Sequence, residues 1–197
     1  MRSLRRALAA VLTLTALSAC VESPGPPAPE SVQVAPGLTL VLPRPTDLGR
    51  SLDVSQFVTV EYADQTFTFE GQISATPERF LLAIVDPVGR RALTITWTDQ
   101  SIRYDAAPWY PQAVRPENIL ADLILLYWPE EIVRAALHGS GGSLLVGVHD
   151  RSILLAGREV IHADFQPRRT DPWSGTAHYQ NRAWHYDMRI QSVVATR

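Results

Sequence analysis

The amino-acid sequence predicts a mainly β protein with a helical insertion, arranged as an antiparallel half-open β-barrel with an α-helical lid. About ten short segments alternate apolar and polar residues, the period of strands that have one face in a core. Short turn sequences separate many of these segments, as in antiparallel hairpins. A strongly apolar helical stretch interrupts the alternation near the middle of the chain. One helical pair between two groups of strands favours a curved sheet whose open side the helices cover.

The chain begins with the layout of a secretory signal peptide. Three arginines precede an apolar run from Ala7 to Ala16, and small residues precede Cys20. The run is too short for a membrane-spanning helix, which needs roughly 20 apolar residues. Because the residues before Cys20 are similar to a bacterial lipobox, we predict that residues 1–19 are removed and that Cys20 is acylated. The alternative is a conventionally secreted protein with a free thiol.

A proline-rich segment follows the cysteine. We assign residues 20–37 to the lipidated cysteine and an extended tether, and residues 38–197 to a single half-barrel domain. The acyl chains would attach the protein to a membrane of the cell envelope. Val21, and not Asp, follows Cys20, which in enteric bacteria is compatible with export to the outer membrane. We therefore expect a lipid-anchored protein at the outer membrane, facing the periplasm. The tether prolines are Pro24, Pro26, Pro27, Pro29 and Pro36.

Strand-like segments of the first half begin soon after the tether. The alternation in residues 66–74 places Phe67, Phe69 and Ile73 on one face. Residues 79–85 are almost continuously apolar, so we expect this strand to be covered on both faces. The connections at residues 63–65 and 86–89 have turn compositions. The expected strands are residues 38–42, 56–62, 66–74, 79–85, 92–98 and 101–105.

Two helices are expected between the halves. Pro116 suits a first helical turn, and residues 119–128 form an apolar segment. A second helix begins at Pro129, has acidic residues in its first turn, and stops at Gly139. The apolar helix must pack on something, and we expect it over the concave face of the sheet. Strands then resume at residues 144–148, 153–156, 159–165, 177–181 and 184–194.

Composition excludes several functional classes. With 46% hydrophobic and 19% charged residues, the chain is an ordinary globular protein with room for a core. The net charge of −2 lacks the basic excess of a nucleic-acid-binding protein, so no nucleic-acid partner is expected. A single cysteine can form neither an intramolecular disulfide nor a thiolate metal cluster.

No catalytic or metal-binding pattern emerges from the polar residues. The glycine-rich residues 139–143 lack the G-x-S-x-G order of a nucleophile loop. Asp86, Asp99 and Glu117 are isolated carboxylates that suit turns and helix starts. We therefore expect no catalytic residue, no metal, no cofactor and no enzymatic activity. The histidines, which show no paired ligand spacing, are His138, His149, His162, His178 and His185.

Several stretches resemble known lipoprotein families. Residues 79–89 followed by 92–95 look like the strand, Asn-Pro-Leu-Gly turn and strand of LolB, the outer-membrane lipoprotein receptor, and residues 119–128 match the position of its helix. More closely, three phrases resemble a family of uncharacterised bacterial lipoproteins whose members are often encoded beside aryl-polyene pigment genes. Those phrases are residues 89–94, 115–122 and 190–193.

The resemblance to LolA and LolB implies a half-barrel with an apolar cavity for acyl chains. LolB presents a bulky apolar residue on a protruding loop, whereas residues 72–78 here are short and polar. This difference favours another lipid or a polyene-like chain over membrane insertion of lipoprotein cargo. The same apolar side chains can instead form a filled core. The candidate cavity residues are Phe67, Phe69, Leu82, Ile84, Leu93, Ile95, Trp97, Tyr104, Leu123 and Leu126.

The resulting functional expectation is a lipoprotein that binds a lipid, an acyl chain or a lipid-modified partner and assists its transport or localisation. The expected partners are a membrane, through the anchor, and an acyl chain or lipoprotein ligand. A monomer is expected. The alternative is a non-catalytic scaffold or assembly accessory of a membrane-associated biosynthetic complex.

Overall fold

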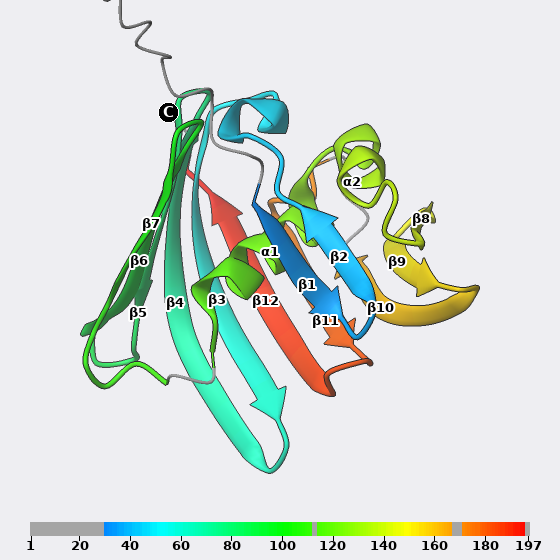
Figure 1. Ribbon diagram of the computed structural model, residues 1–197. Helices are drawn as coiled ribbons and strands as arrows, with labels where there is room; N and C mark the ends of the chain where they lie inside the picture. The colour runs from blue at the N-terminus through cyan, green and yellow to red at the C-terminus, as the bar shows by residue number, and fades with distance from the viewer. Residues whose placement is uncertain (1–29, 112–113, 167–170, 196–197) are drawn as a thin grey trace, which may run out of the picture.

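The computed structural model describes residues 30–111, 114–166 and 171–195. Ten strands form one antiparallel sheet that curves without closing into a barrel (Figure 1). A separate two-stranded hairpin lies on the concave side. The chain is therefore mainly β, with antiparallel strands and a helical insertion, as predicted.

The first half of the chain contains seven strands and a short 3-10 helix among the described residues. They are β1 (Ser31–Ala35), β2 (Leu38–Val41), η1 (Pro45–Leu48), β3 (Leu52–Tyr62), β4 (Gln65–Thr76), β5 (Arg79–Val85), β6 (Arg91–Thr98) and β7 (Ile102–Ala106). The second half begins with the helical pair and continues with five strands. They are α1 (Pro116–Tyr127), α2 (Glu130–Ala136), β8 (Gly142–Val146), β9 (Asp150–Leu155), β10 (Arg158–Gln166), β11 (Gly175–Asn181) and β12 (Tyr186–Val194).

The strand order explains why the helices cross the sheet. The order is β7-β6-β5-β4-β3-β12-β11-β10-β9-β8, so the two strands that flank the helical pair in sequence occupy opposite edges. The connection from β7 to β8 must therefore span the width of the sheet, and α1 does so on the concave side (Figure 1).

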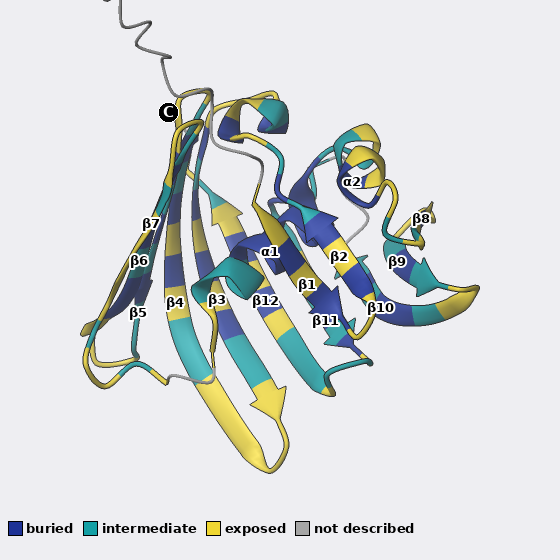
Figure 2. Cartoon of the chain, viewed as in Figure 1, coloured by how far each residue is buried: buried dark blue, intermediate teal, exposed yellow. Residues whose placement is uncertain are grey.

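The strand register places alternate side chains on the concave face. Ile73 on β4 lies opposite Leu82 on β5, which lies opposite Ile95 on β6. All three are buried, in agreement with the alternation in the sequence. Burial weakens along β3 and β4 toward the hairpin that joins them (Figure 2).

Helix α1 is buried on all sides for most of its length. Pro116 occupies its first turn with Glu117 beside it, and Pro129 follows its C-cap residue, Trp128. Every residue from 120 to 128 is buried. The sheet covers one side of the helix, and β1 packs against it on the concave side. The prediction that the apolar helix packs over the concave face is confirmed.

The predicted tether is wrong at its C-terminal end. We expected residues 20–37 to be an extended spacer, but residues from Ser31 onward belong to the folded domain. Pro36 and Gly37 connect β1 to β2, and Gly37 has a φ of 78°, so the proline serves a tight turn. Val32, Val34 and Leu40 are buried beside α1. The predicted signal peptide, Cys20 and the rest of the tether lie outside the described residues.

Three strands differ from their predicted form in smaller ways. Strand β5 is buried on one face only, because Phe80, Leu82 and Ile84 point into the core while the residues between them are partly exposed. Strand β2 pairs with β1 and not with the main sheet. Strand β12 begins at Tyr186 and not at residue 184.

Candidate functional site: the concave face of the sheet

Under α1, aromatic rings fill the concave face. The Trp128 ring lies 5.8 Å from Trp97 and 5.5 Å from Phe80 between centroids. Tyr127 stacks on Trp173 at 4.3 Å. Trp128 and Trp173 are almost fully buried, so the rings form a packed cluster rather than the wall of an open cavity. We call this region, with the inward-facing residues beneath α1, the covered region.

One carboxylate lies inside this otherwise apolar packing. Asp122, near the middle of α1, accepts hydrogen bonds from Tyr179 Oη at 2.5 Å and from Tyr186 Oη at 2.7 Å. Among the described residues it is the one buried residue with an ionisable acid or base other than tyrosine. Burial raises the pKa of Asp122 to about 7, although the two tyrosine hydroxyls oppose the rise.

Two further polar contacts hold the C-terminal half of α1. Gln56 Nε2 donates to Tyr127 Oη at 3.2 Å and to Ser192 Oγ at 3.0 Å. Arg151 Nη1 donates to the carbonyl oxygens of residues 126 and 128, at 3.1 and 2.8 Å. These carbonyls have no partner within the helix, so the guanidinium caps it. Burial lowers the pKa of Arg151.

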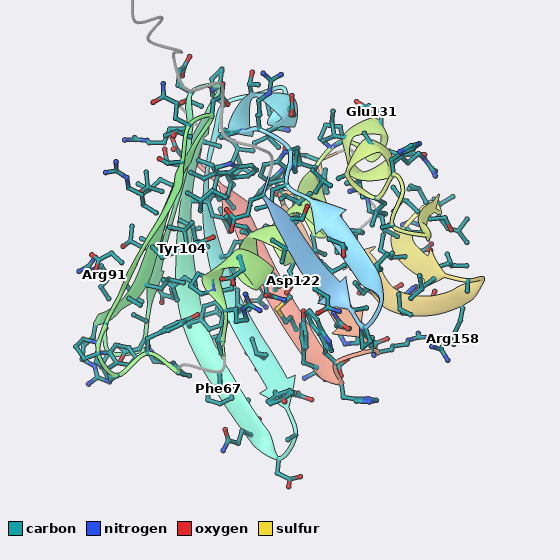
Figure 3. All side chains as sticks on the ribbon, viewed as in Figure 1. Phe67, Arg91, Tyr104, Asp122, Glu131 and Arg158 are labelled. Carbon is teal, nitrogen blue, oxygen red and sulfur yellow. The ribbon has the colours of Figure 1, made fainter. Side chains whose placement is uncertain are left out.

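Beyond α1, toward the β3–β4 hairpin, the concave face is less covered. Val60 on β3 lies opposite Phe67 on β4 and Met188 on β12. Phe67 is 38% exposed, and Val60, Phe69 and Met188 are partly buried and pack against the core. We call Val60, Phe67, Phe69 and Met188 the open end. Figure 3 labels Phe67 near the hairpin and Asp122 on α1.

The open end continues directly into the core. Val58 and Ile190, the next inward residues along β3 and β12, form a cross-strand pair and are 5% and 3% exposed. The apolar surface of the concave face therefore extends without interruption from the packed interior to solvent.

The ten predicted cavity residues divide into three groups. Seven are buried within one continuous core and contact other side chains: Leu82, Ile84, Leu93, Ile95, Trp97, Leu123 and Leu126. Phe67 and Phe69 lie at the open end. Tyr104 is the third group: it lies opposite Ile95 on the edge strand β7 and is 37% exposed. Burial and the nearby Glu30 and Glu117 raise its pKa.

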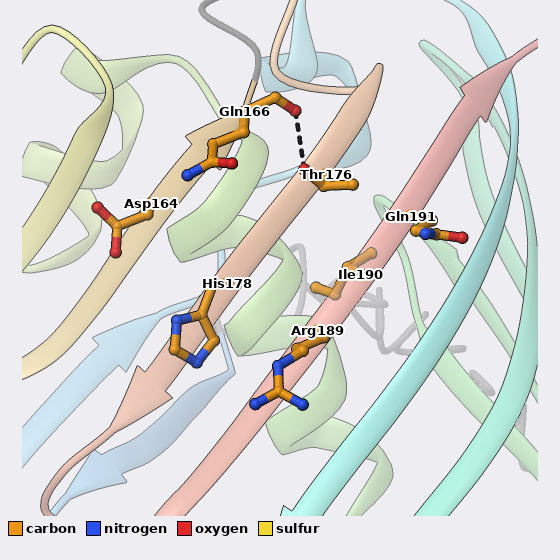
Figure 4. Close-up of a pocket in the computed structure, with 7 residues that line it drawn as sticks. All are labelled: Asp164, Gln166, Thr176, His178, Arg189, Ile190 and Gln191. Atoms are coloured by element: carbon orange, nitrogen blue, oxygen red, sulfur yellow. Dashed lines mark hydrogen bonds between the residues drawn. The ribbon is translucent and has the colours of Figure 1, made fainter.

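A hollow of about 290 Å³ lies on the opposite, convex face (Figure 4). His178 and Arg189 belong to its lining, and Thr176 Oγ1 donates to the Gln166 carbonyl beside them. Six of its seven lining residues are polar or charged by type: Asp164, Gln166, Thr176, His178, Arg189 and Gln191.

A serine and a histidine also meet on the convex face. Ser152 Oγ lies 2.9 Å from His162 Nδ1, but it donates its proton to Glu159 Oε2 at 2.5 Å. The hydroxyl proton is therefore directed away from the base that a nucleophilic serine needs. Within the described residues, no group of three or more His, Cys, Asp or Glu side chains could hold a metal ion.

Sequence reasoning missed the polar groups that position α1. The sequence marks Asp122 only as part of the family-like residues 115–122, and Tyr179, Tyr186 and Arg151 belong to no recognisable motif. A lone carboxylate inside the apolar residues 119–128 is the signal that could have identified Asp122, because an acid on a buried helix needs polar partners.

The comparisons with known proteins identify a family. The sequence profile of the family described as "Protein of unknown function (DUF3261)" matches residues 53–194, more than half of the chain. The chain belongs to this family. The DUF3261 region contains α1, Asp122, its tyrosine partners and the open end, whereas the β1–β2 hairpin precedes it. No curated protein matches the chain. None of the helices in the described ranges is long and apolar enough to cross a membrane.

Proposed function

We propose that this DUF3261 protein is an outer-membrane-directed lipoprotein that binds a lipid, an acyl chain or a lipid-modified partner on its concave face and assists its transport or localisation. The observation that carries the proposal is the open end, where partly exposed apolar side chains continue the core surface. An acyl chain bound there would remove Phe67 and its neighbours from water. This burial would stabilise the complex by roughly 25 cal/mol per Å² of apolar surface.

The likeness to the LolA and LolB half-barrels belongs to the same proposal. An open antiparallel sheet with a helix on its concave side supports it. The connection from β4 to β5 consists of Pro77 and Glu78 alone, so the bulky loop of LolB has no counterpart at this turn. Ligand holding is therefore favoured over membrane insertion of cargo. No enzymatic activity is proposed.

Binding of a fluorescent fatty acid tests the proposal. The full chain, washed free of detergent, should bind cis-parinaric acid, and Phe67→Glu should weaken binding at least about tenfold because a carboxylate would contact the acyl chain. Phe57→Glu is the matched control, since Phe57 lies on the neighbouring strand, is 46% exposed and points to the convex face. The proposal fails if the wild-type protein does not bind, or if both variants bind equally well.

A non-catalytic scaffold or assembly accessory is the second candidate. The packed aromatic cluster favours it, because the space between Trp97 and α1 is filled by Trp128. A purified complex of fixed stoichiometry that survives Phe67→Glu, together with absence of fatty-acid binding, would support this alternative.

A further inference from the structure

The Asp122 cluster connects four elements of the fold. The carboxylate belongs to α1, and its hydroxyl donors come from β11 and β12. Asn181 Nδ2 lies 3.4 Å from Tyr186 Oη and donates to the Val34 carbonyl of β1 at 3.0 Å. The cluster therefore links the helix and the N-terminal hairpin to the sheet beneath them.

The hairpin depends on α1 for its position. It pairs with no strand of the ten-stranded sheet. Besides the Asn181 contact, Asn118 Nδ2 on α1 donates to the Gln33 carbonyl at 3.2 Å. A movement of α1 away from β11 and β12 would thus remove the hairpin's contacts with the helix and leave its Asn181 bond to β11.

The surroundings of Asp122 offer no compensating charge. The titratable groups that face it are Tyr179 on β11 and Tyr186 on β12, whose pKa values are raised well above the ordinary value by burial and by the carboxylate itself. Both tyrosines therefore stay neutral, and β1 contributes only the Val34 carbonyl through Asn181. No arginine or histidine among the described residues contributes to the pKa of Asp122. An ionised Asp122 is stabilised by hydroxyl donors alone, one on each carboxylate oxygen. A protonated Asp122 accepts from one tyrosine hydroxyl, and its own O–H donates to the other tyrosine oxygen.

We propose that α1 and the β1–β2 hairpin form a lid over the concave face, held closed while Asp122 is protonated and loosened when Asp122 ionises. A buried carboxylate without a cation regains its hydration only if the helix separates from Tyr179 and Tyr186. That separation would uncover the covered region next to the open end. The inference rests on the proposed function only in its purpose, which is to give a ligand access to the concave face. The lid movement itself requires no ligand.

The direction of the pH dependence follows from the two states of the carboxylate. In the closed state the pKa of Asp122 is raised from 3.8 to about 7, whereas an opened, hydrated carboxyl has an ordinary value. The closed state therefore holds the proton more tightly, and it loses stability relative to the open state as the pH rises from about 4 to about 7. The pKa values of Asp122 in the closed and open states differ by about three. The ratio of open to closed molecules can therefore change by at most roughly a thousandfold.

Hydrogen exchange measured by mass spectrometry on the full chain, without added lipid, tests the lid. After correction for intrinsic rates, we expect protection of residues 116–127 and 31–41 to fall at least about tenfold between roughly pH 5 and pH 8. Protection of β3 and β4 is the internal reference and should change much less. The proposal is overturned if the lid segments keep their protection, or if the whole sheet loses protection to the same extent.

Substitutions assign the effect to Asp122. Asp122→Asn should make lid protection independent of pH, while Glu131→Gln, which removes a carboxylate from an exposed position of α2, should retain the wild-type profile. If Asp122→Asn does not fold, Tyr186→Phe provides a second test. Loss of a hydrogen-bond donor to the carboxylate should move the midpoint to higher pH. An unchanged midpoint in that variant would contradict the proposal, whatever the result of fatty-acid binding.

Discussion

The covered region and the open end are parts of the same concave face, yet they differ in what lies over them. Both are built from alternating residues of the central strands, and both are apolar. Under α1, Phe80 is fully buried, whereas Phe67, on the neighbouring strand, is 38% exposed. The difference comes from the helix and not from the strands. A strand pattern determines which side chains share a face, and the crossing segment determines which of them are buried.

The largest expected effect separates the two regions directly. Phe80→Ala should lower the free energy of unfolding by about 3–5 kcal/mol, because it opens a cavity between Trp97 and Trp128. Phe67→Ala should cost less than about 1 kcal/mol, since its side chain is already partly in water. Urea denaturation of both variants measures the contrast. Equal losses would mean that the open end is packed as tightly in solution as the covered region.

Removal of the helix cap should have the next largest effect. Arg151→Ala leaves the carbonyls of residues 126 and 128 without their donor, so we expect a loss of about 2–3 kcal/mol. Arg158→Ala, at an exposed position on the adjacent strand β10, is the control and should be within about 0.5 kcal/mol of wild type. Thermal unfolding of the two variants makes the comparison. A neutral Arg151→Ala would show that water satisfies the helix end.

A smaller effect is expected from the polar contact beneath the end of α1. Tyr127→Phe removes the acceptor of Gln56 Nε2 while keeping the ring that stacks on Trp173, and should cost about 1 kcal/mol. Tyr62→Phe changes the same atom at a position that is 52% exposed and should have no measurable effect. Denaturant titrations followed by tryptophan fluorescence distinguish the two. A loss in both variants would contradict the contrast between buried and exposed hydroxyls.

The smallest effect concerns the contact between α1 and the hairpin. Asn118→Ala removes the hydrogen bond to the Gln33 carbonyl, which is exposed to water, so a loss of about 0.5 kcal/mol is expected. Hydrogen exchange should rise in residues 31–41 and remain unchanged in β3 and β4. A rise throughout the sheet would show that this contact also stabilises the ten-stranded sheet.

The predicted strands were close to the observed ones because their evidence was local. Alternation and turn residues located β3 to β7 within a few positions, and a proline followed by acidic residues located both helices. The strand β1 was missed because Pro36 was interpreted as part of a spacer. Its role depends on Gly37, whose positive φ turns the chain back toward β2.

The site was less predictable because its residues meet only in the folded chain. Tyr179 and Tyr186 lie 57 and 64 residues from Asp122 in sequence. Whether the candidate cavity is open or filled also depends on packing between residues that are distant in sequence. Trp173, distant in sequence from α1, supplies one of the rings that fill the space, and periodicity does not report such contacts.

The position of β12 has a consequence for how the protein is made. This strand, Tyr186–Val194, is the last of the described strands in sequence but lies in the middle of the sheet, between β3 and β11. A nascent chain can form the β3–β7 meander and the β8–β11 meander, but no strand pairing joins them until β12 is available. Pairing of the complete ten-stranded sheet must therefore wait until residues 186–194 have been synthesised, and such sequence-distant pairing is slow. A truncation of only the last strand would leave two separate sheets, each with an unpaired edge prone to aggregation.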